Sequence, residues 1–457
     1  MSLINIHDTV SSARVEPLSL AQDRGKSEVR IGDLTSDVPF RAGVEYTPPA
    51  RGTWTIAHTP MLVPGSMEIF VCPDGCLRGV VLSAAEFDGM DRFAMITVKE
   101  GNLYDGRMDQ LIIDGVTDIL EHRDSLPTAV LLFCSCIHKM IYTDTKYVYK
   151  TLRERFPTVD FIECYMDCTM RKSKIFYEEA VNRQLYDAIR PRPRNPKAVN
   201  IIGNYFSLYP KSELLQMFQA NGWTVRELPN LKTYEQYQEM GEAVLDIYTH
   251  PLGGIAAKTL ADRAGANVVY APYAWDYGSI EHGIRDAAEA AGLPCPDFAA
   301  ERQKAEKALD GLRDSIGEIE IQIDAAGTPR PLELARLLLS HGFRVTAVYL
   351  DAISGEETAA RDWLRAHHPD LKIRSIVNFR GRTNPRDEAE RLDGQLLAIG
   401  QKAAYFTGTK HFVNLIYNRG LHGYAGIVRL CELMDEAVRE EKETREIIQV
   451  KAWGCHG

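Results

Sequence analysis

Short apolar runs separated by amphipathic stretches are the feature of this sequence that most constrains its fold. From Trp54 onward, runs such as residues 67–72 and 128–136 are apolar almost throughout, without the alternation of a strand that has one face in water. Strands buried on both faces have this pattern. The stretches between them, such as 111–122 and 145–155, read as amphipathic helices. The sequence therefore predicts parallel sheets with helices on both faces.

The same pattern occurs three times along the chain of 457 residues, a length that suggests roughly two to four domains. The proline- and arginine-rich segment 189–196 is expected to lack regular structure and marks a boundary between the first two series. We predict an α/β chain of three Rossmann-like, doubly wound parallel-sheet domains. Its parts are an extended N-terminal arm at 1–50, domains at 51–195 and 196–320, and a third domain with the C-terminal helix and tail at 321–457.

In the later domains the apolar runs predict individual elements. The expected strands of the second domain are 198–205, 224–228, 243–248 and 266–271. The expected strands of the third domain are 344–350, 372–379 and 403–407. Helices are predicted at 299–318, at 331–341 before a glycine stop signal, and at 423–442.

Composition and charge exclude several classes of function. The formal net charge of −10 gives no support to general nucleic-acid binding. No apolar run approaches the roughly 18 residues of a membrane-spanning helix, and the N-terminus lacks the apolar core of a secretory signal, so we expect a cytoplasmic protein without membrane partners. In a reducing compartment the nine cysteines are expected to be free thiols, metal ligands or redox groups.

Four of these cysteines stand where two predicted strands end. Cys72 and Cys76 flank a tight proline- and glycine-containing turn, which brings their sulfurs near each other and leaves backbone N–H groups free. Cys134 and Cys136 end the strand predicted at 128–136, where strand alternation puts both on one face. Because parallel strands end at a common edge, the four thiols are expected to approach one another and to bind a soft iron–sulfur cofactor.

Other uses of the cysteines stay open. Buried cysteine often serves as a small hydrophobe, zinc would also suit these thiols, and the spacing matches no standard ferredoxin run. Cys164 and Cys168 end the next predicted strand and are expected to pack rather than bind. Cys295, Cys431 and Cys455 are isolated, and we assign them no role.

These residues resemble the nitrogenase component 1 family, whose two subunit types each have three Rossmann-like domains. In that family a glycine–cysteine turn in the first domain and a cysteine that ends a later strand help to hold an iron–sulfur cluster at the subunit interface. Cys76 and Cys136 match these two positions in setting and order. IIGNY at 201–205 and LHGYAG at 421–426, where the family has a glycine–aromatic–x–glycine turn, extend the resemblance to the last helix.

The resemblance implies a P-cluster-like 8Fe–7S or a 4Fe–4S cluster with Cys72, Cys76 and Cys136 as metal ligands. The family usually has a further ligand cysteine well upstream of the turn, but no cysteine precedes Cys72 in this sequence. Either Cys72 or Cys134 replaces it, or the ligand set differs.

The resemblance also implies a role and partners. The family's cofactor-bearing subunit uses a cysteine in domain two and a histidine in domain three, whereas residues 244–254 contain no cysteine and the segment before 421–426 lacks the histidine-bearing loop. The chain is therefore expected to be the other subunit type, which relays electrons to a homologous sister subunit in an α2β2 heterotetramer. No P-loop is present, so ATP use would belong to the family's homodimeric iron protein, the expected electron donor. The amino-acid sequences of residues 53–65 and 71–79 are similar to those of nitrogenase-like reductases such as methylthio-alkane reductase, which cleaves carbon–sulfur bonds.

Three other functions stay open: a tetrapyrrole (chlorophyllide-type) reductase subunit, a non-catalytic scaffold for cofactor assembly, and a zinc or thiol-redox α/β protein. His58, His138 and His250 stand near predicted strand ends and are expected to be structural. His138 follows Cys136 closely, so it could also orient a cluster sulfur.

Overall fold

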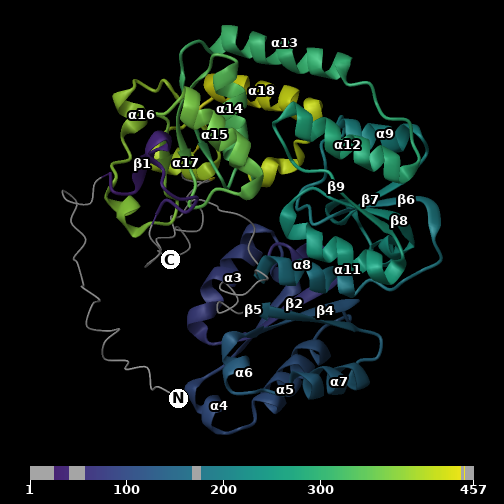
Figure 1. Ribbon diagram of the computed structural model, residues 1–457. Coiled ribbons are helices and arrows are strands. Elements are labelled where there is room, and N and C mark those ends of the chain that lie inside the picture. Colours follow the sequence, from purple (N-terminus) through teal and green to yellow (C-terminus); the bar gives the residue numbers. More distant parts are fainter. Residues whose placement is uncertain (1–24, 41–56, 167–176, 444–446, 448–457) are drawn as a thin grey trace, which may run out of the picture.

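The computed structural model describes residues 25–40, 57–166, 177–443 and 447, and these form three α/β units (Figure 1). The first unit lies at the bottom of Figure 1, the second at the right and the third at the upper left, in chain order. The predicted α/β class with Rossmann-like parallel sheets is confirmed. Among the described helices, none combines the length and the apolar character needed to cross a membrane.

The first unit contains a four-stranded parallel sheet in the order β3-β2-β4-β5. Helices α3 and α8 pack on one face, and α5 and α7 pack on the other. The two strands predicted to end at cysteines are present, and all their residues are buried as the apolar runs imply. The strands are β2 Ser66–Cys72, β3 Phe93–Thr97, β4 Ala129–Ser135 and β5 Asp160–Met166, and the helices are α3 Asp74–Glu86, α4 Glu100–Tyr104, α5 Met108–Glu121, α6 Cys136–Met140, α7 Thr145–Arg155 and α8 Tyr177–Asp187.

The second unit repeats this topology with a parallel sheet in the order β7-β6-β8-β9. All four strands were expected from the sequence, with small differences at their ends. The strands are β6 Asn195–Ile202, β7 Thr224–Glu227, β8 Ala243–Tyr248 and β9 Asn267–Tyr270, and the helices are α9 Glu213–Ala220, α10 Tyr234–Gln238, α11 Gly254–Ala264 and α12 Tyr277–Ala291.

The third unit has six strands in the order β1-β12-β11-β10-β13-β14, all parallel except β1, which pairs antiparallel with β12. The strands are β1 Glu28–Arg30, β10 Glu320–Asp324, β11 Arg344–Tyr349, β12 Lys372–Arg374, β13 Leu396–Ile399 and β14 Phe412–Val413. The helices are α13 Ala299–Ile316, α14 Pro331–Ser340, α15 Thr358–His367, α16 Glu388–Arg391, α17 Gln401–Thr407 and α18 Gly423–Arg439.

Three expectations about this unit were wrong or incomplete. Residues 403–407 belong to helix α17 rather than a strand, because a short fully buried apolar run has no period that separates the two states. The strand predicted at 372–379 ends at Arg374. The side chain of Arg374 forms ion pairs with Glu28 and Glu388 there. Within the expected N-terminal arm, Glu28–Arg30 is an edge strand of the third sheet.

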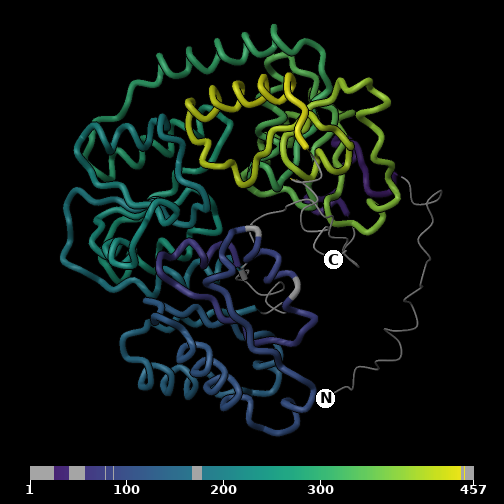
Figure 2. The backbone as a smooth tube through the Cα atoms, turned by 180° about the vertical axis from the view of Figure 1, so that it is seen from behind, coloured from purple at the N-terminus to yellow at the C-terminus, as the bar shows by residue number. Residues whose placement is uncertain are grey.

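Helix α13 joins the second unit to the third and lies beside α18 along the top of both views (Figures 1 and 2). Ser315 Oγ donates a hydrogen bond to Asp435 Oδ1 over 2.7 Å between these helices. Leu309 and Leu312 of α13 are buried in the same core cluster as Leu430 and Met434 of α18. The charged helix predicted at 299–318 is thus a structural connection between units.

A pair of buried polar side chains lies at the centre of the second sheet. Asn200 of β6 and Asp246 of β8 are register partners, and both are 0% exposed. Asn200 Nδ2 donates to Asp246 Oδ1 over 2.8 Å, whereas Asn200 Oδ1 and Asp246 Oδ2 have no partner among the described residues. Burial raises the pKa of Asp246 to about 7, with the Asn200 hydrogen bond opposing part of the effect.

Asp246→Asn is expected to make folding less sensitive to pH. An unfolded aspartate titrates near about 4, below the folded value of about 7, so the unfolded state releases its proton first as pH rises. The native chain therefore loses up to roughly 4 kcal/mol of stability across this window, and the variant does not. As pH rises from about 4 to about 7, the thermal midpoint of the wild type should therefore fall relative to that of the variant.

The control is Asp262→Asn, which removes a carboxylate that is 64% exposed on α11 and paired with Lys258. This variant is expected to show the same dependence of the thermal midpoint on pH as the wild type. A difference between Asp246→Asn and the wild type that stays constant across the window would contradict the assignment of this pKa.

Candidate functional site

Each of the three parallel sheets has a point where the strand order reverses. These switch points lie between β2 and β4, between β6 and β8, and between β10 and β13. In open α/β sheets, ligands bind beyond the carboxyl ends of the strands at such points. The fold therefore offers three candidate positions.

At the second and third of these positions, backbone segments that follow the neighbouring strands lie close together. A Cβ on Gly203, just after β6, would lie 2.5 Å from the Cα of Gly253. A Cβ on Gly327, just after β10, would lie 3.2 Å from the Cα of Gly400. Of the three, the first switch point is the one that presents thiol side chains within the described part of the chain.

Two cysteines occupy the first switch point. Cys76 is the third residue of α3, which follows β2, and its side chain is exposed. Cys136 is the first residue of α6, which follows β4, and it is partly exposed. Because β2 and β4 are parallel neighbours with Val71 opposite Cys134, both thiols start from the same sheet edge.

The first turn of α3 suits a negatively charged sulfur site. Pro73 caps this helix without a side-chain hydrogen bond, and of the N–H groups in the first turn that of Cys76 donates to the Pro73 carbonyl oxygen over 2.9 Å. Such N–H groups and the positive end of the helix stabilise thiolates and cluster sulfur.

Cys72 and Cys134 lie deeper, on opposite faces of the sheet. Cys72 packs in the core beneath α3 and α8, and Cys134 packs in the core beneath α5 and α7. Burial is the largest cause that raises the pKa of each thiol to about 12, with Cys76 and Asp74 adding to the effect at Cys72, and Glu163 and Cys72 adding to it at Cys134.

The expectation that Cys134 and Cys136 share one strand face was wrong. Strand β4 ends at Ser135 and Cys136 begins α6, so the two-residue period stops between them.

The remaining cysteines are dispersed. Cys164 on β5 is 0% exposed and faces the same core as Cys72, and burial raises its pKa well above the usual value. Cys431 is buried on α18, while Cys295 is exposed. Cys168 and Cys455 lie outside the described residues.

His138 supports the turn that carries Cys136. It is 2% exposed, and its Nδ1 lies 3.1 Å from the carbonyl oxygen of Ser135. Burial lowers the pKa of His138. Nδ1 also lies 3.3 Å from the Ser135 hydroxyl oxygen, and Nε2 has no hydrogen-bond partner among the described residues. This geometry fits a residue that orients a neighbouring sulfur.

The other two candidate histidines have structural surroundings. His58 is 1% exposed, with its ring 5.9 Å from that of Phe87. His250 Nδ1 accepts a hydrogen bond from the Leu252 N–H over 3.1 Å, and burial lowers the pKa of His250 to about 4.

The described cysteines do not form a complete metal site within one chain. Over residues 25–40, 57–166 and 177–443, no group of three or more Cys, His, Asp or Glu side chains is arranged to hold a metal ion. Soft thiols at an exposed sheet edge nevertheless fit one side of a cluster shared between two polypeptides.

Glu68 is a buried ionisable residue that sequence reasoning missed. This glutamate of β2 is 1% exposed, and its two carboxylate oxygens have no hydrogen-bond partner among the described residues. Burial raises its pKa well above the usual value, with Arg92 opposing the effect. The available signal was a single acidic residue inside the otherwise apolar run 67–72.

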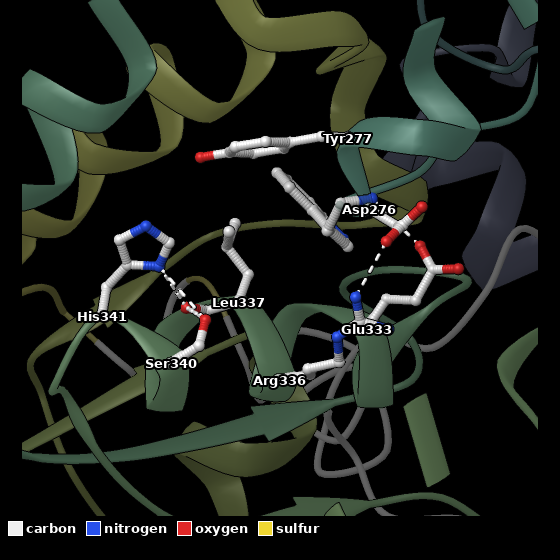
Figure 3. Close-up of a pocket in the computed structure, with 8 residues that line it drawn as sticks. Asp276, Tyr277, Glu333, Arg336, Leu337, Ser340 and His341 are labelled. Carbon is white, nitrogen blue, oxygen red and sulfur yellow. Dashed lines mark hydrogen bonds and ion pairs between the residues drawn. The ribbon is translucent and has the colours of Figure 1, made fainter. Parts of the chain in front are cut away.

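Two cavities elsewhere in the molecule have different surroundings. A small one of about 180 Å³ lies between α12 and α14, where Arg336 binds Asp276 over 3.0 Å and Glu333 accepts from the Trp275 N–H (Figure 3). A larger one of about 730 Å³ lies between α9, α13 and α18, where Lys304 pairs with Glu301. The smaller cavity is lined by no cysteine and the larger by one, Cys295, so neither offers the pair of thiols found at the cysteine edge.

Comparison with known proteins shows the family to which this chain belongs. A model of the family "nitrogenase component 1 type oxidoreductase" matches residues 60–439. The chain therefore belongs to the nitrogenase component 1 type oxidoreductase family. A search of curated proteins finds no match.

Solved structures with the same fold are titled as nitrogenase. One, "Nitrogenase Cp1 at pH 6.5", has a TM-score of 0.61 and 14% identity, and the match covers 88% of this chain and 96% of that chain. Another, "Nitrogenase Cp1 at pH 5", has a TM-score of 0.56 and 12% identity, and covers 95% of this chain and 97% of that chain. At these identities the likeness establishes the fold.

Proposed function

We propose that this chain is the electron-relay subunit of a nitrogenase-like reductase, with Cys76 and Cys136 as ligands of a shared iron–sulfur cluster. The observation that carries the proposal is that these two accessible thiols lie on helices that directly follow two neighbouring strands, β2 and β4, at the first switch point. Such edges bind ligands in open α/β sheets, and thiolates are the usual ligands of iron–sulfur clusters.

The ligand set is completed from a second polypeptide in this proposal, because one chain presents too few donors. The partner is a homologous sister subunit in an α2β2 heterotetramer, and the cluster is P-cluster-like 8Fe–7S or 4Fe–4S. Cys72 is the third ligand proposed from this chain, and Cys134 is the reserve candidate. Both are buried thiols, so binding would require loss of their protons and a local rearrangement.

The protein's contribution is to hold and tune the cluster. When bound, the cluster stores and passes single electrons. The N–H groups in the first turn of α3 stabilise negative charge on sulfur, which favours the reduced state. His138 fixes the turn at Cys136 through its bond to Ser135 and so holds that thiolate in position.

Aromatic rings pack between the segments that the resemblance aligns with the cysteine and the histidine of the cofactor-bearing subunit type. The rings of Tyr205 and Tyr417, from the second and third units, lie 4.9 Å apart. The ring of His250 meets that of Tyr417 edge-on at 5.4 Å. This packing supports a role without an active-site cofactor, so electrons would pass to the sister subunit. There we propose reductive carbon–sulfur cleavage of methylthio-alkanes, with an ATP-dependent homodimeric iron protein as donor.

Iron and acid-labile sulfide analysis of the complex purified without oxygen tests this proposal. We expect both elements, in a brown preparation whose paramagnetic resonance signal changes on reduction. A simple four-iron signal with turnover of a tetrapyrrole would favour the chlorophyllide-type alternative. Cluster transfer to another protein without turnover would favour an assembly scaffold. A colourless complex without iron would refute the electron-relay role.

A further inference from the structure

The larger of the two cavities lies between helices of different units. Helix α9 belongs to the second unit, α13 connects this unit to the third, and α18 is the last helix of the third unit; α13 and α18 run along the top of Figure 1, with α9 at the right. We call this space of about 730 Å³ the seam cavity. Its volume falls within the range of about 300–1,000 Å³ that is typical of small-molecule sites.

A buried carboxylate in the wall of the seam cavity has an oxygen atom without a partner. Glu213, the first residue of α9, lines the cavity and is 8% exposed. Its Oε1 accepts a hydrogen bond from the Ala425 N–H over 2.9 Å, whereas Oε2 has no hydrogen-bond partner among the described residues. Burial is the largest cause that raises the pKa of Glu213; backbone N–H groups oppose this effect, and the charge of Glu301 adds to it. A buried acceptor in this state favours a donor or a positive charge beside it.

The charged groups around the seam cavity are mostly acidic. Lys304 pairs with Glu301 over 2.7 Å, and Arg429, just outside the lining, pairs with Glu432 over 2.7 Å and with Glu436 over 3.0 Å. Counting Arg429 and Glu436 with the lining adds one charge of each sign and leaves the balance of the lining unchanged. That balance is −2, from four carboxylates and two ammonium groups: Glu213, Asp297, Glu301 and Glu432 against Lys211 and Lys304. Such an excess of negative charge in a concave site attracts cations.

The rest of the wall indicates an organic cation rather than a metal ion. Apolar side chains line the cavity from α9, from the loop before α13 and from α18, among them Met217, Pro294, Pro296 and Val428. Over residues 25–40, 57–166 and 177–443, the acidic side chains are not grouped as ligands of a metal ion. Apolar walls with a few placed charges are typical of sites for small organic molecules.

We propose that the seam cavity binds a small organic cation, an amine with an apolar body, whose ammonium group donates a hydrogen bond to the Glu213 carboxylate. The site is distinct from the cysteine edge, because its wall comes from the second and third units and their connection, whereas Cys76 and Cys136 belong to the first unit. The inference therefore does not depend on the proposed function. A cation bound there contacts α9, α13 and α18 together and stabilises their packing.

Isothermal titration calorimetry of the full-length chain in its complex tests the proposal with matched pairs of ligands. Butylamine, cyclohexylamine and phenethylamine are each compared with the alcohol of the same shape, namely butan-1-ol, cyclohexanol and 2-phenylethanol. At least one amine should bind about ten-fold or more tightly than its alcohol, because only the amine forms a charge-assisted hydrogen bond to the buried carboxylate. Glu213→Gln keeps an acceptor for the Ala425 N–H and should remove this preference. Equal binding of amine and alcohol in all three pairs would overturn the proposal.

Control variants separate the seam cavity from general attraction of amines to a chain with a net charge of −10. Asp262→Asn removes an exposed carboxylate from α11 and should keep the amine affinity within about two-fold of the wild type. Val428→Trp fills the cavity from α18 and should remove binding, whereas Val428→Thr has nearly the same volume and should keep it. Amine binding that persists in Val428→Trp, or that falls equally in Asp262→Asn and Glu213→Gln, would show general attraction and overturn the site.

Cys295 gives a second readout that does not depend on the heat of binding. Its thiol is exposed and belongs to the lining of the seam cavity. A saturating amine should slow alkylation of Cys295 by iodoacetamide at least about three-fold, because a bound molecule covers the wall beside it. Peptide mass mapping measures the rate, and Glu213→Gln should lose the protection. An unchanged alkylation rate in the wild type under saturating amine would place the bound molecule elsewhere and overturn the proposal.

Discussion

Replacing Cys76 or Cys136 by serine is expected to remove most of the iron from the complex. Both thiols stand at the edge where β2 and β4 end, and they are exposed or partly exposed there. Even hydrogen-bonding partners of metal ligands change affinity by about 10–100-fold when mutated, so loss of a ligand should cost at least about ten-fold. Iron, sulfide and visible absorbance, measured on complexes purified without oxygen, give the readout.

Cys295→Ser is the matched control, since it removes an exposed thiol from a loop far along the sequence. It should leave the iron content unchanged. Equal iron in Cys76→Ser, Cys136→Ser and Cys295→Ser would contradict the ligand assignment. Circular dichroism of each variant separates loss of the cluster from loss of the fold.

The same series identifies the third ligand. If Cys72 is a ligand, Cys72→Ala should lose iron as fully as Cys76→Ser does, and Cys134→Ala should keep it. If Cys134 replaces the upstream cysteine of the family, the reverse pattern is expected. Both are core side chains, so each alanine variant is also expected to lose stability by about 1–3 kcal/mol, and this loss should appear whether or not iron is lost.

The strands that precede the candidate cysteines could be predicted because the sequence pattern that identifies them is local. The expected strand 67–72 differs from β2 by one residue, since a continuous apolar run bounded by a turn has few other solutions. Strand β10 was missed because Glu320, Gln322 and Asp324 make it look polar. These side chains are buried and gain hydrogen bonds from distant parts of the chain, as when the Tyr349 hydroxyl donates to Gln322.

The geometry of the site was less predictable than its position. Strand alternation cannot reveal that β4 ends one residue before Cys136, nor that Cys72 and Cys134 face opposite cores. The pairing of Glu28–Arg30 with β12 joins residues more than three hundred positions apart, which no local pattern encodes. The exposed residues 140–142 had a visible signal as three consecutive apolar residues, but their exposure depends on the turn at Tyr142.

The LHGYAG segment at 421–426 shows how a family motif can be structural. The His422 Nε2 lies 3.2 Å from the carbonyl oxygen of Ala271, and the Tyr424 hydroxyl donates to Glu281 over 2.6 Å. Both partners belong to the second unit, while the motif begins the last helix of the third. The segment therefore fastens the two units together where α18 starts.

Gly423→Ala is expected to lower the free energy of unfolding by about 2–5 kcal/mol. Gly423 has a φ of +75°, which costs alanine roughly 1–2 kcal/mol. A Cβ there would also lie 1.9 Å from Glu213 Oε2, and such overpacking typically costs about 1–3 kcal/mol. Glu213 cannot easily move, because its other carboxylate oxygen accepts from the Ala425 N–H over 2.9 Å and so caps α18 from the neighbouring unit.

A double-mutant cycle with Glu213→Ala separates these two costs in denaturant unfolding. Removing the carboxylate relieves the clash but not the backbone strain, so Gly423→Ala should cost only about 1–2 kcal/mol in the Glu213→Ala background. Gly311→Ala on α13 is the control, because a Cβ there meets nothing within 4 Å. As a helix-interior glycine it should gain about 0.5–1 kcal/mol. If Gly423→Ala lowers the free energy of unfolding equally with and without Glu213, the close approach of this carboxylate does not contribute to the loss. The backbone conformation would then be the sole reason that position 423 requires glycine.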